Sequence, residues 1–535
     1  MEEFSTDILI IGSGLAGLMA ALEAEKKGLS VTLLGKFAIG MGTNTSLASS
    51  FTAANSRFSK EDHLRATLEA GKGLNRPNLV NVLVEEGGSA IARLIGEGIP
   101  MIEDGIGYDP DFNQPGSQLP GVLLMRRLRE RLRNTTVRLL PGLTVFDLVV
   151  EGGELQGAFG FFRDGKPCLI RAKAAILATG GAGAIYGRND NQRSTLGDGY
   201  GLALRAGLPL YDLEFVQFYP FVLAEPRLSS FILLALPEEG RLFNEKGEDV
   251  LEQMGIEEPL PRAILTQRDR LSRFLHEASQ GGDVYYDLTK VAPEAWTRFP
   301  FNFLEKSKFP FRERPFLVAP AVHFFMGGAE IDEKAKTAIP GLFAAGEVAW
   351  GVHGANRLGG NAVTECVVFG SIAGQSAVEY VCRQAEGQGS RLTPEAFHRR
   401  WERKAETYLQ KKRGVFDHPR DLMKQLRHLV WQYGGPVRQE SSLAEGAETL
   451  AALQKRVERV YPDTLPDLFG KRVLENMALL TQAILKGSLL RQESRGAHHR
   501  KDFPGQDDQN WLKHTCYRLE KGEMVITYRS VVTLC

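Results

Sequence analysis

The sequence has few cysteines for its length, and they lie too far apart to act together. Its 535 residues contain five cysteines and no Cys-x-x-Cys pair. A disulfide framework, a structural zinc site and an iron–sulfur cluster held by this chain therefore all lack ligands at a usable spacing. The five positions are Cys168, Cys366, Cys382, Cys516 and Cys535. We expect no metal site and a cytoplasmic environment.

The sequence also lacks an excess of charge of one sign and a long apolar run. Lys+Arg and Asp+Glu are equal at 65 each, so no overall field attracts nucleic acid or anionic lipid. No apolar run approaches the ~18–20 residues of a membrane span. The chain begins with Met1, Glu2 and Glu3, unlike the basic start of a signal peptide. We expect no nucleic-acid partner, and contact with the inner face of a membrane only through another protein.

Glycine, in contrast, is abundant, and its first cluster follows a predicted strand. Gly accounts for 57 of the 535 residues, about 11% against roughly 7% in average proteins. The apolar run Asp7–Ile11 precedes the glycine-rich residues 12–17 (Gly-Ser-Gly-Leu-Ala-Gly), a helix that ends at Gly28, and a second strand at Val31–Leu34. A strand, a glycine-rich turn, a helix and a strand within about 30 residues are the context of the dinucleotide-binding fingerprint.

Each glycine of this turn has its own predicted role. Gly12 permits the turn, Gly14 lets backbone N–H groups approach a pyrophosphate, and Gly17 lets the helix pack on its strand. The helix N-terminus would hold the phosphates by its partial positive charge. The second strand ends in Gly35-Lys36, where an acidic residue often binds the ribose, so the ribose contact stays unassigned.

Two further glycine clusters follow strands, at residues 174–181 and 340–347. Three such turns predict one nucleotide domain interrupted by insertions, because each returns the backbone to the same ligand. The stretch 215–320 lacks alternation of strands and helices and is predicted to be an inserted domain.

The last third of the chain has helical periodicity after a predicted linker at residues 385–390. Residues 465–535 are predicted to form another helix and an irregular tail. The periodic apolar positions before that are Leu422, Leu426, Leu429, Val430, Leu443, Leu450, Leu453 and Val457.

Several motifs, in this order, resemble the flavoprotein subunits of succinate dehydrogenase and fumarate reductase, with the related L-aspartate oxidases. The resemblance covers most of the chain. The motifs are residues 214–220 (Glu-Phe-Val-Gln-Phe-Tyr-Pro), 323–328 (His-Phe-Phe-Met-Gly-Gly), 351–361 (Gly-Val-His-Gly-Ala-Asn-Arg-Leu-Gly-Gly-Asn), 493–498 (Glu-Ser-Arg-Gly-Ala-His) and 507–512 (Asp-Asp-Gln-Asn-Trp-Leu).

The resemblance implies an α/β fold: a Rossmann-like FAD-binding domain with an inserted α+β capping domain and a C-terminal helical domain. The implied bounds are 1–214 and 321–385 for the FAD-binding domain, 215–320 for the capping domain, 390–480 for the helical domain and 481–535 for the tail.

The resemblance also implies an FAD site. In many respiratory members a His within Ser-His-Thr bonds FAD covalently, and Asn44 stands at that place here. Asn cannot form that bond, so we predict non-covalent FAD. The residues expected to contact FAD are Gly12, Gly14, Ala16, Gly17, Lys36, Thr43, Asn44, Thr45, Thr179, Gly180, Asp198, Glu347, Arg357, Gly360 and Asn361.

Members of the family move a hydride between flavin N5 and a C–C bond flanked by carboxylates, while a proton moves at the other carbon. Arg357 matches the family's carboxylate clamp, and a guanidinium suits a planar carboxylate. His323 matches the histidine that holds the same end of the substrate. Arg262 matches the arginine that passes the proton.

Residues at the far end of the substrate differ from the family's pattern. Tyr219 replaces a histidine, and Ile232, Leu233 and Leu236 stand where Thr, Glu and Arg would be. Burying a second carboxylate against such a wall would cost several kcal/mol. We therefore expect a small substrate with one carboxylate-like group and a less polar far end. Tyr219, Glu238 or its neighbour Glu239 would then transfer the proton.

Three functions stay open. The first is an oxidoreductase subunit that exchanges electrons with an iron–sulfur partner. The second is a soluble enzyme like L-aspartate oxidase, although residues 101–118 lack its Arg-Glu-Gly-Gly-His-Ser segment and residues 358–361 read Leu-Gly-Gly-Asn, not Leu-Ala-Ser-Asn. The third is a flavin relay without substrate turnover. Residues 493–496 and 507–512 would either face a partner or pack against the FAD domain, and the adjacent His498 and His499 are not assigned to a metal.

Overall fold

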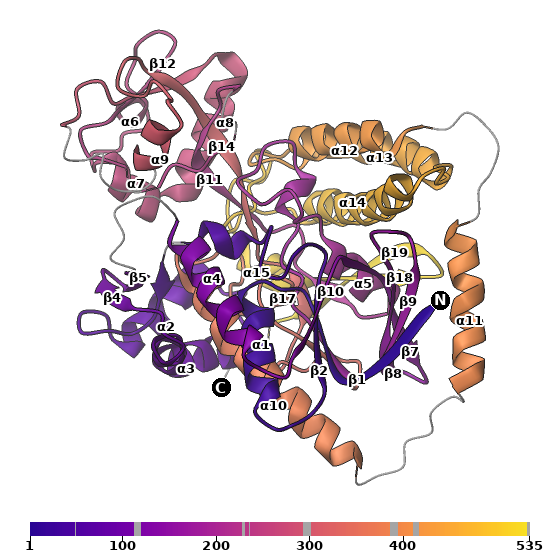
Figure 1. Cartoon of the computed structure of the whole chain (residues 1–535). Helices are drawn as coiled ribbons and strands as arrows, with labels where there is room; N and C mark the ends of the chain where they lie inside the picture. The colour runs from indigo at the N-terminus through magenta and orange to yellow at the C-terminus, as the bar shows by residue number, and fades with distance from the viewer. Residues whose placement is uncertain are drawn as a thin grey trace.

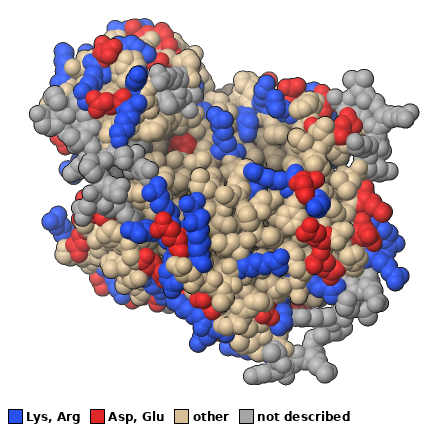
Figure 2. Space-filling model, viewed as in Figure 1, with Lys and Arg blue, Asp and Glu red and all other residues tan. Residues whose placement is uncertain are grey.

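The computed structural model describes residues 1–48, 50–111, 119–226, 230–234, 236–292, 301–385, 394–409 and 417–531. Its elements form a central body, a separate capping lobe and a helical bundle beside them (Figure 1). Among the described residues, no helix is both long and apolar enough to cross a membrane. Acidic and basic side chains are interspersed over the face shown in Figure 2, as the balanced composition predicts.

The body is built on a largely parallel sheet whose strands run in the order β6-β2-β1-β9-β8-β7, with β16 also paired to β9. Helices α1 and α10 pack together against it. The strands are β1 (Glu2–Ile11), β2 (Val31–Gly35), β6 (Arg138–Pro141), β7 (Leu143–Glu151), β8 (Glu154–Phe162), β9 (Pro167–Leu177) and β16 (Leu342–Ala344). The body's helices are α1 (Leu15–Glu25), α2 (Lys60–Ala70), α3 (Pro77–Gly96), α4 (Pro120–Arg133), α5 (Asp198–Arg205) and α10 (Asn361–Ala385).

Strand register explains why the three glycine clusters meet. Ile11 of β1 is the lateral neighbour of Leu177 of β9, and Leu177 is in turn the neighbour of Ala344 of β16. All three strands are parallel, so the turns that follow them leave the same edge of the sheet. The predicted convergence is present in the structure.

The capping lobe has its own sheet, in the order β11-β14-β13-β12, and its own apolar core between Tyr219 and Ala321. Strand β14 leads directly back into the body. The elements are β11 (Val216–Leu223), β12 (Arg241–Asn244), β13 (Val284–Asp287), β14 (Phe316–Phe325), α6 (Val250–Gln253), α7 (Leu260–Thr266), α8 (Arg268–Gly281) and α9 (Phe301–Lys306).

The helical bundle contains α12 (Pro419–Tyr433), α13 (Glu440–Glu458) and α14 (Leu465–Leu490), and the eight predicted apolar positions in α12 and α13 are all buried. Helix α11 (Pro394–Leu409) lies apart from them (Figure 1) and stacks Trp401 on Phe159 of β8.

The C-terminal tail is not irregular, contrary to the sequence-based expectation. A short helix α15 (Asp508–Trp511) precedes an antiparallel hairpin of β18 (Lys513–Glu520) and β19 (Glu523–Ser530). Both turn residues, Lys521 and Gly522, have positive φ, as two-residue hairpin turns require. The hairpin joins β10 (Leu210–Tyr211), β15 (Gly328–Glu330) and β17 (Ala349–Trp350). A third small sheet holds β3 (Phe51–Thr52), β4 (Met101–Asp104) and β5 (Gly107–Pro110).

Candidate functional site

The turn after β1 has the steric properties of a pyrophosphate site. Gly12 has φ of 114°, and a Cβ there would stand 2.2 Å from the carbonyl oxygen of Ala178. A Cβ on Gly17 would stand 2.0 Å from the Gly12 carbonyl oxygen. Gly14, in contrast, has no atom nearer than 3.8 Å to its Cβ position, so space is open at the start of α1. Ala16, the second residue of α1, is buried.

Two predicted FAD contacts, Lys36 and Asp198, are paired with each other at 2.8 Å. The second oxygen of Asp198 accepts a hydrogen bond of 3.1 Å from Asn476. Both side chains are about a quarter exposed, so the pair lies at the edge of the site, and the ribose contact stays unassigned.

Residues 43–45 border the open space beside Gly14. The hydroxyl of Thr45 accepts a bond from the backbone N–H of Leu15. The hydroxyls of Thr43 and Thr179 are buried, with no partner among the described residues. Orphaned buried hydroxyls are costly unless a ligand bonds them, and both flank the glycine turns. Gly180, next to Thr179, has φ of 73°. These residues therefore fit a phosphate-bearing, hydroxyl-rich cofactor such as FAD.

Asn44 is held by its neighbours. Its amide nitrogen donates to Asn191 at 2.6 Å, and its oxygen accepts from the backbone N–H of Gln192 at 2.9 Å and from Thr195 at 3.2 Å. The side chain orders the loop opposite the turn and offers no nucleophile.

Glu347 and Asn361 shape the turns after β16. Glu347 is buried, accepts a bond of 3.1 Å from the backbone N–H of Phe325, and fills the space that a Cβ on Gly181 would need. Burial raises its pKa to about 7. Asn361 begins α10, where its side chain bonds His63 and Thr67.

The turn between them requires glycine. Gly360 has φ of 77°, and a Cβ there would lie 2.3 Å from the hydroxyl of Thr52. This turn carries the chain from Arg357 into α10.

Arg357 and His323 lie close enough at the edge of the capping lobe for the charge of the arginine to act on the histidine. Arg357 is 7% exposed and stands over the ring of Phe324 at 4.7 Å, and its Nε has no partner among the described residues. Burial, and then the charge of Arg268, lower its pKa to about 9. His323 bonds Asp190 through Nδ1 at 2.7 Å. Burial lowers the pKa of this histidine, while Asp190 raises it.

Arg262 is not part of this cluster, which corrects the sequence-based assignment. Its side chain is 76% exposed and lies 3.6 Å from Glu258. The apolar residues of α7, Leu260 and Ala263, face the core of the lobe, which turns Arg262 outward.

Arg268, at the start of α8, is the guanidinium that the structure brings to the cluster. Its Nη2 lies 3.4 Å from the Cβ position of Gly359, and its guanidinium stands 6.0 Å from the ring of Tyr219. Its Nε is buried and has no partner in the part of the chain that the structure describes. Sequence reasoning missed Arg268 because it is only six positions after Arg262, and only the change of direction between α7 and α8 distinguishes the two arginines.

The far wall holds Tyr219 but not Glu238. Tyr219 is buried, lies 5.6 Å from the His323 ring between centroids, and donates its hydroxyl to the carbonyl of Leu233 at 2.9 Å. Burial raises its pKa. Ile232, Leu233 and Leu236 are buried in the core of the lobe. Glu238 and the neighbouring Glu239 are exposed to solvent.

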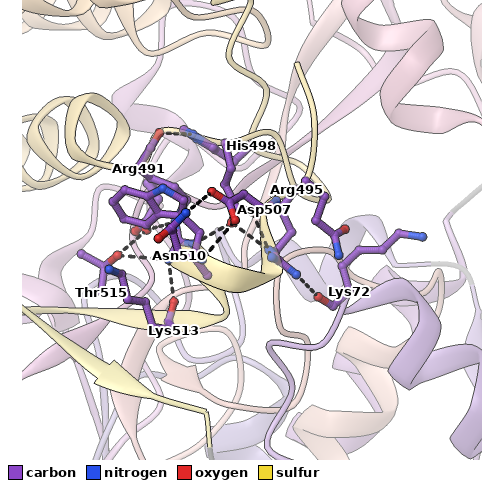
Figure 3. Close-up of polar contacts among 12 residues, drawn as sticks. Lys72, Arg491, Arg495, His498, Asp507, Asn510, Lys513 and Thr515 are labelled. Carbon is purple, nitrogen blue, oxygen red and sulfur yellow. Dashed lines mark hydrogen bonds and ion pairs between the residues drawn. The ribbon is translucent and has the colours of Figure 1, made fainter. Parts of the chain in front are cut away.

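The motif at residues 493–498 packs inward. Arg495 and Glu493 are fully buried and paired at 2.8 Å. Arg495 also donates to the carbonyl of Lys72 at 2.8 Å (Figure 3). The backbone N–H of Ala497 donates to the carbonyl of Ala355. The motif thus supports the loop that carries Arg357.

His498 is bonded to Arg438 at 2.8 Å, and burial lowers its pKa well below the ordinary value. Within the described ranges, no group of three or more His, Cys, Asp or Glu side chains could hold a metal.

Two family models match the chain. Residues 7–363 match the model described as an FAD binding domain, and residues 423–534 match the model described as the C-terminal part of the fumarate reductase flavoprotein. The first match alone covers more than half of the chain.

Relatives of nearly full length have about a third of their residues in common with this chain. An uncharacterised FAD-dependent oxidoreductase of Methanocaldococcus jannaschii is 32% identical over 93% of this chain and 94% of its own. The fumarate reductase flavoprotein subunit of Escherichia coli is 31% identical over 99% and 94%. An L-aspartate oxidase of Bacillus subtilis is 30% identical over 97% and 95%.

A solved structure of Escherichia coli quinol fumarate reductase superimposes with a TM-score of 0.89 and 29% identity, covering 100% of this chain and 98% of that one. The predicted fold class is confirmed by this match.

Proposed function

The chain belongs to the flavoprotein family of fumarate reductases and succinate dehydrogenases, FAD-dependent oxidoreductases, and from this premise we propose the reaction it catalyses. The reaction is hydride transfer at a C–C bond next to a carboxylate. Bound FAD supplies the hydride acceptor or donor. Residues around Gly14, Thr43 and Thr179 would hold it.

The observation that supports this reaction is a pair of guanidinium groups beside a histidine, the buried one of Arg357 and the partly exposed one of Arg268. Arg268 and Arg357 each have a buried Nε without a partner among the described residues, and both influence the titration of His323. Two guanidinium groups that form no ion pair with a carboxylate among the described residues are able to bind a small anion. A protein that only relayed electrons would need neither.

The substrate we propose carries one carboxylate and a less polar far end. Tyr219 occupies the wall, and its hydroxyl proton is already donated to Leu233. Burying a second carboxylate there without a donor would cost several kcal/mol.

We further propose that electrons pass to or from an iron–sulfur subunit, through which any membrane contact would be made. The relatives named as fumarate reductase flavoprotein subunits support this assignment. The similarity to L-aspartate oxidases over nearly the whole chain supports the second candidate, an enzyme that reoxidises its flavin without such a partner.

A flavin reoxidation assay tests the reaction class. The holoprotein is photoreduced without oxygen and mixed in turn with crotonate, fumarate and iminoaspartate. We expect crotonate, an enoate with one carboxylate, to reoxidise the flavin faster than fumarate. Preference for fumarate would contradict the proposed far end, preference for iminoaspartate would favour the oxidase, and no reoxidation by any of them would leave only the relay.

A further inference from the structure

The two arginines of the cluster come from different parts of the molecule. Arg268 begins α8 of the capping lobe, whereas Arg357 lies in the loop of the body that leads to α10. In the proposed reaction Arg268 takes the role that the resemblance assigned to Arg262, that of the arginine that passes the proton. Both guanidinium groups must therefore meet the same substrate, and their separation depends on how the lobe is held against the body.

A hydrogen bond beside both arginines connects the lobe with the body. Asp269 follows Arg268 in α8, and its Oδ2 accepts a bond of 2.6 Å from the amide nitrogen of Asn356. Asn356 in turn precedes Arg357 in the loop. Both bonded side chains are partly buried. Burial raises the pKa of Asp269, whereas the positive charge of Arg268 lowers it. We call the bond between Asp269 and Asn356 the interlobe bridge.

Gln217 of the lobe bonds the other side of Asn356. Its amide nitrogen donates to Oδ1 of Asn356 at 2.7 Å and to the backbone carbonyl of Arg357 at 3.0 Å. Gln217 is fully buried and belongs to β11. Within the lobe, the hydroxyl of Ser272 in α8 donates to the carbonyl of Phe218 at 3.3 Å, which joins α8 to β11. The lobe therefore contacts Asn356 from two elements that are fixed to each other.

The chemistry of the interlobe bridge fixes the direction of each hydrogen bond. An ionised carboxylate accepts only, so Asn356 presents its NH₂ group to Asp269 and its oxygen to Gln217. Gln217 must then present its own NH₂ group, which also bonds the backbone carbonyl of Arg357. One carboxylate on the lobe thus orders two amides and the backbone of the loop that carries the predicted clamp. Because this bond has an ionised acceptor, it is stronger than a bond between neutral groups.

We infer that Asp269 and Asn356 are positioning residues, which hold the capping lobe against the body with Arg268 opposite Arg357. This inference rests on the proposed function, because it concerns the placement of the same cluster. Without the interlobe bridge, α8 and the loop keep their own conformations but lose their fixed relation to each other. Arg268 then stands beside the substrate in a smaller fraction of the molecules, and the rate falls in proportion.

The variant Asp269→Ala tests the inference in the photoreduced holoprotein, with the compound that reoxidises the wild type fastest. We expect the rate constant at saturation to fall roughly 10- to 100-fold, because a charge-assisted bond between the lobe and the body is lost. Asp269→Asn keeps an acceptor for Asn356 and should stay within about fivefold of the wild type. Glu277→Ala is the matched control, since Glu277 lies on the same helix and joins the lobe to Lys501 by an exposed ion pair of 3.5 Å. Its rate should equal that of the wild type.

An exchange of the two side chains separates the bond from the charge. Asn356→Asp alone sets two carboxylates against each other and should slow the reaction more than Asp269→Ala. The double variant Asp269→Asn/Asn356→Asp restores a donor on the lobe and an acceptor on the body, and Gln217 still meets an oxygen. We expect the double variant to react at least ~10-fold faster than Asn356→Asp. No recovery, or equal losses in Asp269→Asn and Asp269→Ala, would show that the charge of Asp269 acts without the interlobe bridge and would overturn the inference.

Hydrogen exchange tests the interlobe bridge without turnover. In the oxidised holoprotein, we expect the backbone amides of residues 267–273 and 355–361 to exchange at least ~3-fold faster in Asp269→Ala than in the wild type, and at wild-type rates in Glu277→Ala. Equal exchange in Asp269→Ala and the wild type would overturn the inference. A wild type that no compound reoxidises would contradict the proposed function, and the exchange rates would still decide whether the bridge holds the lobe.

Discussion

At the scale of single residues, two arginines close in sequence lie in different places. Arg268 lies in the candidate cluster with Arg357 and His323, whereas Arg262 lies on the surface. Arg268→Gln should slow flavin reoxidation at least ~100-fold, because a positive group beside the proposed substrate site is lost. Arg262→Gln should stay within about twofold, since that side chain is 76% exposed. Stopped-flow rates of both variants, each with bound FAD, make the comparison. Equal losses in the two variants would contradict the assignment of Arg268.

Asn44 determines how FAD is retained. Its amide is not nucleophilic and is bonded on both sides, so we expect denaturation by acid or heat to release all of the flavin into the supernatant. Absorbance near 450 nm in the supernatant and the pellet checks this. A yellow pellet after washing in denaturant would indicate a covalent bond and would refute the prediction of non-covalent FAD.

Glu347 should make folding stability depend on pH. Its pKa in the folded state, about 7, lies above the ordinary value of 4.5. The folded state therefore binds more protons than the unfolded state, and stability falls as pH rises from about 5 to 7, by on the order of 1–3 kcal/mol. Glu347→Gln should flatten this decline. Thermal unfolding midpoints of both holoproteins across that range test it, and parallel curves would contradict it.

At the scale of elements, the C-terminal hairpin supplies hydrogen-bond donors to a buried carboxylate, that of Glu214. Glu214 accepts bonds from the hydroxyls of Tyr517 and Thr515 in β18 and from Arg491. Tyr517→Phe removes one donor, and we expect a loss of about 1–3 kcal/mol of unfolding free energy. Tyr528→Phe, on β19 and 42% exposed, is the matched control and should change stability by less than ~0.5 kcal/mol. Denaturant unfolding of both variants compares them, and equal effects would contradict a role for Glu214.

The elements also show how far the sequence could predict the structure. The three glycine turns were predictable, because parallel strands with glycine at their ends leave the same edge of a sheet. The hairpin was predictable in principle, since Lys521-Gly522 lies between a run that contains Thr515 and Tyr517 and the β-branched and aromatic run Val525–Tyr528. Arg268 and Asp190 were not, because their places depend on how α8 and the loop before α5 dock against β14.

At the scale of the whole molecule, a buried chain of charges connects the C-terminal tail with the body. Arg491 pairs with Glu214 and Glu493, and Glu493 pairs with Arg495, all with fully buried side chains. Arg495 then contacts the carbonyl of Lys72 (Figure 3). Charges buried in this way are stable only as a set, since each lost partner leaves an uncompensated charge.

Arg495→Met should therefore cost about 3–5 kcal/mol of unfolding free energy, because the buried Glu493 loses one of its two arginine partners. The double variant with Glu493→Gln should recover part of that loss, although Arg491 then loses one of its two carboxylates. Asp508→Asn is the control, since Asp508 is bonded to the same arginine but its side chain is 63% exposed, and it should cost less than about 1 kcal/mol. A double-mutant cycle measured by denaturant unfolding tests the coupling. Additive effects, or a loss in Asp508→Asn as large as in Arg495→Met, would show that the arginine acts through its surface contact and not through the buried chain of charges.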